Sequence, residues 1–273
     1  MCRCLYGNGK IDKNWAMTLK QNDVRELYNE FQNENNQTDI YSSFDYCYNY
    51  FHPNSGNPLL KDIEKSCLAI GFYLSSCGML RASAHLLTKS VKCYEPLIKH
   101  IATSKKSNWY LDVNDYESPT VKKKILDLYN GIYNVLKDEV FVNVNQIEPI
   151  ANKKLRTPTL TLVTKIMLGV FGIIPAFDAN FITAFKSLDN LKHRFSPLSD
   201  EPLDLIYEFY IDNKPEIDKL SDLTHTIDFK NGKKTELKYT KAKIIDMYGF
   251  IKGDHIRKVE QAKKRVGKLV KSN

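Results

Sequence analysis

This chain of 273 residues has no long hydrophobic run. Its most apolar stretches are interrupted by Arg81, Lys165 and Pro175, so neither reaches the roughly 20 apolar residues of a membrane-spanning helix. Met1 to Cys4 is followed by glycine, asparagine and lysine, where a secretory signal would have an apolar segment. We therefore expect no membrane span and a cytoplasmic location.

Metal-binding patterns are also missing. The six cysteines match no zinc-ligand spacing, and four of them stand among apolar residues, which is typical of buried thiols. The six histidines are scattered, with no two at metal-ligand spacing. The sequence therefore predicts no metal and no other cofactor.

Charge of the two signs is unequal. Lysine and arginine total 40, aspartate and glutamate total 32, and the net charge is +8. A basic surface attracts polyanions, and we expect DNA as the partner. The same excess is also typical of a basic surface that only keeps a protein soluble.

The hydrophobic pattern predicts a mainly α, multi-helix globular protein. Hydrophobic residues make up 42% of the chain, enough for a sizeable core. An Asn-Gly turn predicts at most one small hairpin, within 227–239. Helical spacing of apolar residues predicts a helix through Lys165 and helices over 22–32, 40–51, 59–87, 90–102, 119–136, 178–191, 203–211, 240–251 and 254–269.

The predicted organisation is an N-terminal arm followed by one globular unit. Residues 1–18 form the arm, and residues 19–273 form the helical unit. Irregular, proline-containing sequence after residue 142 marks a boundary that would divide the unit into lobes 19–142 and 143–273.

Leu160 to Phe185 is the most apolar part of the chain, yet it contains Lys165 and Asp178 around a Gly/Pro corner. Burying an ionised group is costly unless it is paired or used in chemistry. A lysine in an apolar wall is expected to have a lowered pKa and to act as a nucleophile. An aspartate at a helix start stays ionised and can stabilise a cation. In the structural alternative, Asp178 only caps a helix and Lys165 reaches solvent.

Around the corner stand Lys165, Leu168, Gly169, Phe171, Gly172, Pro175, Asp178, Asn180 and Phe181. In these residues the stretch resembles the helix-hairpin-helix DNA glycosylases, the endonuclease-three-like superfamily. The resemblance implies an all-α, two-lobed fold and a hydrolase of base excision, which cleaves the N-glycosidic bond of a modified or damaged base. It also implies that Asp178 stabilises the sugar oxocarbenium and that Lys165 forms a Schiff base, as in abasic-site lyases. The family's glycine hairpin has no counterpart, since 156–160 lacks glycine.

Basic and aromatic residues supply the predicted nucleic-acid contacts, because phosphates attract cations and bases stack on aromatic rings. The C-terminal helix is a further basic surface, suited to DNA, an anionic membrane or an acidic partner. Two other functions stay open: a non-catalytic α-helical nucleic-acid-binding protein, and a helical interaction or regulatory protein. The predicted contact residues are Lys105, Lys106, Trp109, Tyr110, Lys153, Lys154, Arg156 and Asn180.

Overall fold

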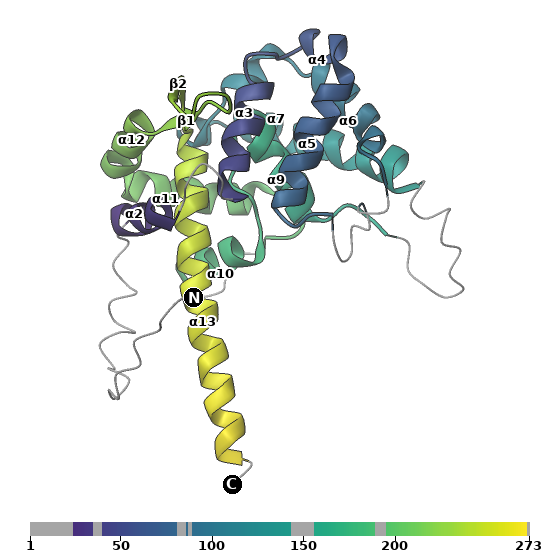
Figure 1. Cartoon of the computed structure of the whole chain (residues 1–273). Helices are drawn as coiled ribbons and strands as arrows, with labels where there is room; N and C mark the ends of the chain where they lie inside the picture. Colours follow the sequence, from purple (N-terminus) through teal and green to yellow (C-terminus); the bar gives the residue numbers. More distant parts are fainter. Residues whose placement is uncertain are drawn as a thin grey trace, which may run out of the picture.

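The structure is a computed structural model, and it describes residues 24–34, 40–80, 86, 89–142, 156–188 and 195–271. This part of the chain is mainly α-helical, with one small antiparallel hairpin, as the sequence predicts (Figure 1). None of the described helices combines the length and the apolar character needed to cross a membrane. The predicted arm lies outside the described residues, and the division into lobes stays a prediction.

The described residues from 24 to 142 form six α-helices and several short turns of helix. The turns are η1 (Ile40–Ser42), η4 (Val91–Tyr94), η5 (Lys106–Tyr110), η6 (Val113–Asp115) and the π-turn η7 (Leu136–Val140). The α-helices are α2 (Val24–Glu34), α3 (Ser43–Phe51), α4 (Pro58–Lys61), α5 (Ile63–Ser76), α6 (Glu95–Ala102) and α7 (Pro119–Val135).

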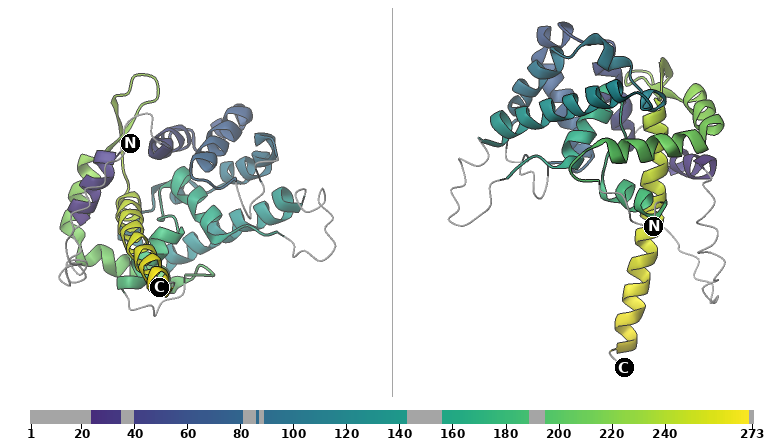
Figure 2. Two further views of the ribbon diagram at one scale, coloured as in Figure 1. Left: turned by 60° about the horizontal axis from the view of Figure 1, so that its bottom comes forward. Right: turned by 180° about the vertical axis from the view of Figure 1, so that it is seen from behind.

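The second part contains the most buried helix and the longest helix. Helix α9 lies against α3, α5 and α7, and helix α13 packs against α10, α2 and α12 (Figures 1 and 2). One cluster of buried side chains includes residues from Val24 to Ile251. The elements are α9 (Leu160–Phe171), α10 (Ala179–Leu188), α11 (Asp200–Asp212), α12 (Lys214–Leu223), β1 (His225–Ile227), β2 (Lys234–Lys238) and α13 (Lys241–Lys271).

The predicted hairpin is present, but several helix boundaries differ from prediction. Strands β1 and β2 pair with His225 opposite Lys238, and the turn between them contains Gly232 at φ +66°. Helix α5 ends at Ser76, well before residue 87, because Gly78 takes a left-handed φ of +72°. The helices predicted at 240–251 and 254–269 are one continuous helix, and α12 was not predicted.

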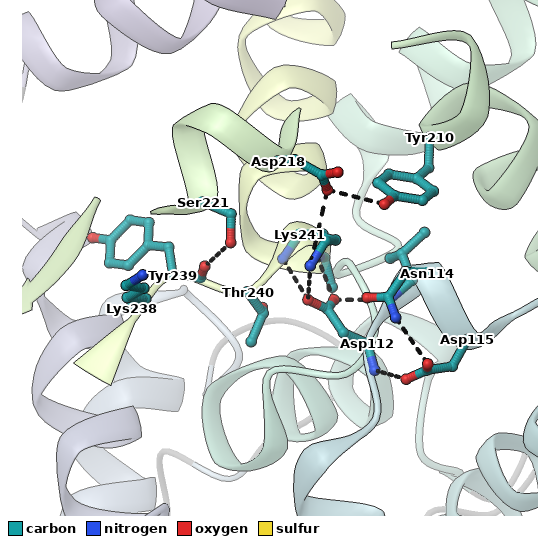
Figure 3. A network of polar contacts seen from close by, with 12 residues as sticks. Asp112, Asn114, Asp115, Tyr210, Asp218, Ser221, Lys238, Tyr239, Thr240 and Lys241 are labelled. Carbon is teal, nitrogen blue, oxygen red and sulfur yellow. Dashed lines mark hydrogen bonds and ion pairs between the residues drawn. The ribbon is translucent and has the colours of Figure 1, made fainter. Parts of the chain in front are cut away.

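Asp112 fixes the start of α13 (Figure 3). Its carboxylate accepts the backbone N–H groups of Lys241 at 2.7 Å and Ala242 at 2.9 Å. It also accepts the N–H of Val113 at 2.8 Å. These bonds satisfy donors that a helix start leaves without partners. Helix α13 is therefore anchored to a segment about 130 residues earlier in the chain.

Only the first part of α13 is packed on the body. Residues such as Ile244, Ile245 and Met247 are buried, and burial ends near Gly253. The side chains of His255 and Arg257 still reach Glu30 of α2 and Asn180 of α10, and beyond them the helix extends away from the other described elements (Figures 1 and 2). Its residues from 260 to 265 are all exposed.

Candidate active site between α9, α10 and α13

The Gly/Pro corner places Asp178 beside α9. Gly172 ends the helix in a left-handed conformation at φ +70°, which glycine adopts without strain. The chain then turns back, and two threonines of α9 hold it. Thr164 accepts the backbone N–H of Phe177 at 2.9 Å, and Thr161 donates to the carbonyl oxygen of Phe177 at 2.8 Å.

Asp178 is both a helix cap and an ion-pair partner. Its Oδ1 accepts the backbone N–H groups of Asn180 at 3.0 Å and Phe181 at 2.9 Å, at the start of α10. Its Oδ2 lies 3.0 Å from Nζ of Lys165. The two side chains are only 17% and 12% exposed. The cap predicted for Asp178 is therefore confirmed, whereas Lys165 pairs with Asp178 and is largely withdrawn from solvent.

A second lysine–aspartate pair comes from α13. Oδ2 of Asp246 lies 3.1 Å from Nζ of Lys243, and these side chains are 8% and 7% exposed. Oδ1 of Asp246 accepts the backbone N–H of Ala176 at 3.0 Å, which ties the corner to α13. The ammonium of Lys243 lies 4.6 Å from the ring centre of Phe44, a favourable cation–π distance.

Both pairs line one cavity of about 160 Å³. Cys77 and the rings of Tyr73 and Phe44 form other parts of its wall. Two lysines and two aspartates give its charged lining no net formal charge. The cavity itself therefore does not attract phosphate, and attraction of a polyanion has to come from elsewhere on the surface.

The pKa of Lys165 moves in the direction opposite to the one expected from the sequence. Burial alone would lower this pKa, but the carboxylates of Asp178 and Asp246 outweigh burial and raise it above its usual value. Lys165 is thus held as an ammonium, which is not nucleophilic. The pKa of the Cys77 thiol is also raised, in this case by burial itself, although Lys165 and Lys243 oppose that shift. This thiol therefore stays protonated.

Asp178 still has room for one more contact. An ionised carboxylate offers about four acceptor positions. Two backbone N–H groups and one ammonium occupy three of them. The remaining position can accept a water hydrogen or face a developing positive charge.

The predicted nucleic-acid contacts do not gather at this cavity. Trp109 is buried and packs on Phe171 with ring centres 4.4 Å apart, so it belongs to the core and is not presented to a base. Lys106 and Tyr110 are exposed on η5, Lys105 is exposed just before it, and none of the three lines the cavity.

The remaining predicted contacts divide into two groups. Lys153 and Lys154 lie outside the described residues. Arg156 is half-buried and is not part of the cavity wall. Asn180 is not part of the cavity wall either, but its backbone N–H donates to Asp178, and its Oδ1 accepts a hydrogen bond of 2.8 Å from Arg257 of α13. The exposed part of α13 therefore begins next to Asp178.

Lys243 and Asp246 were not predicted from the sequence. They stand three positions apart in a run that also contains Ile244, Ile245 and Met247. Two opposite charges at this spacing inside an apolar helical run can pair on one face of the helix. This pattern could have predicted a buried ion pair from the sequence. No feature of the sequence shows that this pair meets Lys165.

No protein-family model, curated protein or solved structure matches the chain. The inferences about function therefore depend on the residues and their geometry.

Proposed function

We propose that the protein acts on DNA as a glycosylase-like hydrolase, with Asp178 as its catalytic carboxylate. The observation that carries this proposal is the position of Asp178, in the wall of a cavity and beside the basic part of α13. A largely buried carboxylate with a vacant acceptor position can stabilise an oxocarbenium-like sugar and orient the attacking water. The resemblance of the corner to the helix-hairpin-helix glycosylases agrees with this role.

Lys165 has a positioning role in this proposal. Its ammonium holds Oδ2 of Asp178 at 3.0 Å while the backbone of α10 holds Oδ1, so the carboxylate keeps one orientation. A protonated lysine does not attack the sugar. The activity we propose is hydrolysis of the N-glycosidic bond without a covalent lyase step.

The basic part of α13 supplies the attraction for DNA that the neutral cavity lacks. From Asp254 to Arg265 this helix carries five basic residues and two acidic ones. Among them Lys263, Lys264 and Arg265 are exposed and have no ion-pair partner in the described part of the chain. Phosphates on a strand that follows α13 would lie close to Asn180, and therefore to Asp178.

The test is release of free base from duplex oligonucleotides that each carry one modified or mismatched base. We expect release by the wild type and a loss of at least about 100-fold in Asp178→Asn. The asparagine side chain keeps an oxygen that can cap α10. A melting temperature of the variant close to that of the wild type verifies that the variant is folded. Asp212→Asn, an exposed change of the same kind on α11, is the matched control. Equal activity of a folded Asp178→Asn variant would contradict the proposal.

A non-catalytic nucleic-acid-binding protein is the second candidate, favoured by the same projection of α13. Replacing Lys263, Lys264 and Arg265 by serine would then weaken DNA binding. If all three contact phosphates, the slope of log K against log salt falls by about 2.7 for duplex DNA. Such binding with no base release would support this function. Absence of DNA binding would leave a helical interaction or regulatory protein.

A further inference from the structure

A second cavity of about 270 Å³ adjoins the candidate active site. Phe31 and Tyr41 line both cavities. The second cavity lies between α2, the start of α3 and the hairpin. Its volume is close to the lower end of the about 300–1,000 Å³ that small-molecule sites occupy.

An acidic group lines the most buried part of this cavity. Asp45 is 3% exposed. Its Oδ1 accepts a hydrogen bond of 2.6 Å from the hydroxyl of Tyr239, and its Oδ2 accepts the N–H of Ile227 at 3.0 Å. These bonds use two of about four acceptor positions. A ligand that presents N–H groups can use the others.

Basic groups line the outer part of the same cavity. Lys234 is exposed and has no ion-pair partner among the described residues. His225 is half-buried, and its Nδ1 lies 2.8 Å from the carbonyl oxygen of Thr235. A carbonyl only accepts, so Nδ1 carries the hydrogen, and Nε2 of the neutral ring is then an acceptor. The exposed ammonium of Lys234 is suited to an anion.

Aromatic rings also line the cavity. The rings of Phe31 and Tyr41 have centres 5.0 Å apart, and the ring of Tyr239 also lines the cavity. Aromatic rings pack well against planar heterocycles. The cavity thus combines an anion site, a stacking wall and a buried acceptor.

We propose that this cavity binds one nucleotide unit, with its phosphate at Lys234 and the N–H groups of its base toward Asp45. A nucleotide matches the cavity because it carries its negative charge at one end and hydrogen-bond donors on a planar ring at the other. The unit can be a free mononucleotide or an unpaired nucleotide of a strand. The inference needs no chemistry at Asp178 and stands if the protein releases no base.

The test is titration calorimetry of the full chain with dAMP, dCMP, dGMP and dTMP, with the four nucleosides, and with single-stranded octamers. We expect at least one nucleotide to bind, with its nucleoside about tenfold weaker. Lys234→Ala should weaken that nucleotide by a similar factor. Lys233→Ala removes the same charge from an exposed neighbour outside the cavity and should leave binding within about twofold.

The octamers distinguish the two sources of the nucleotide. Tighter binding of an octamer than of its mononucleotide, with the same loss in Lys234→Ala, identifies a strand as the ligand. Equal affinities identify a free nucleotide. The proposal is overturned if no mononucleotide binds at millimolar concentration, or if Lys233→Ala and Lys234→Ala weaken binding equally. Since Lys234 is exposed, its variant tests the proposal without risk to the fold.

Discussion

Nζ of Lys165 lies 3.0 Å from Oδ2 of Asp178, and Oδ1 of the same carboxylate caps α10. One side chain thus joins α9 to α10 and also lines the cavity that we propose as the active site. A structural role and a catalytic role depend on the same atoms. They are separated only by experiments that measure stability and activity together.

Removal of the charge of either Lys165 or Asp178 should destabilise the protein. Removal of both charges should lower the free energy of unfolding by less than the sum of the two single losses. Lys165→Met leaves Asp178 buried without its cation, for which we expect a loss of about 3 kcal/mol in the free energy of unfolding. Asp178→Asn leaves Lys165 near Asp246, for which we expect about 2 kcal/mol. Chemical denaturation of both variants and the double variant gives the coupling energy. Additive losses would show that the pair contributes no interaction.

Lys165 should not form a covalent adduct with DNA. Because Asp178 and Asp246 keep its pKa raised, almost none of it is a free amine at neutral pH. We expect no borohydride-trapped product on DNA that contains abasic sites, for the wild type and Lys165→Arg alike. An adduct that forms with the wild type and disappears in Lys165→Arg would instead establish the lyase role that the family resemblance implies.

Asp45 should make stability fall as pH rises from about 4 to about 6. Burial raises the pKa of this carboxyl from 3.8 to about 6. Between these values the folded protein keeps a proton that the unfolded chain has released, so rising pH favours unfolding. A shift of this size corresponds to about 3 kcal/mol. The free energy of unfolding of Asp45→Asn relative to wild type should increase by this amount over the window. A flat difference would show that Asp45 has an ordinary pKa.

Asp112→Ala should destabilise the start of α13. The change removes an acceptor for three backbone N–H groups (Figure 3), and we expect a loss of about 3 kcal/mol. Asp222→Ala is the control, because Asp222 is an exposed partner of Lys238 and such pairs contribute little. Thermal or denaturant unfolding compares the two variants, and equal small losses would contradict the anchoring role.

Two helical glycines should respond differently to alanine. At Gly253 an added Cβ would clash with the backbone oxygen of Asn180, which cannot move without shifting α10. We expect Gly253→Ala to cost about 2 kcal/mol or more. At Gly131 the added Cβ would meet the mobile ring of His100. Because alanine favours a helix, Gly131→Ala should change stability by less than about 1 kcal/mol. Similar losses of stability at both positions would contradict the close approach of Gly253 on α13 to the backbone of Asn180 on α10.

The local sequence was sufficient to predict the elements and part of the site. Helical spacing of apolar residues predicted the mainly α fold, and the Asn-Gly turn predicted the hairpin. The predicted cap at Asp178 is present because capping depends on residues two and three positions away. These features depend on short-range contacts, which a sequence pattern records directly.

The sequence alone identified Lys165 and Asp178 as residues that could carry chemistry, and the tertiary structure decided their state and brought Asp246 and Asp45 into the two cavities. Asp246 lies 81 positions from Lys165, yet its carboxylate helps to raise the pKa of that lysine. Asp45 and the hairpin are separated by about 180 residues and form one cavity. Electrostatic energy and burial depend on distances in space, which the spacing of residues along the chain does not specify.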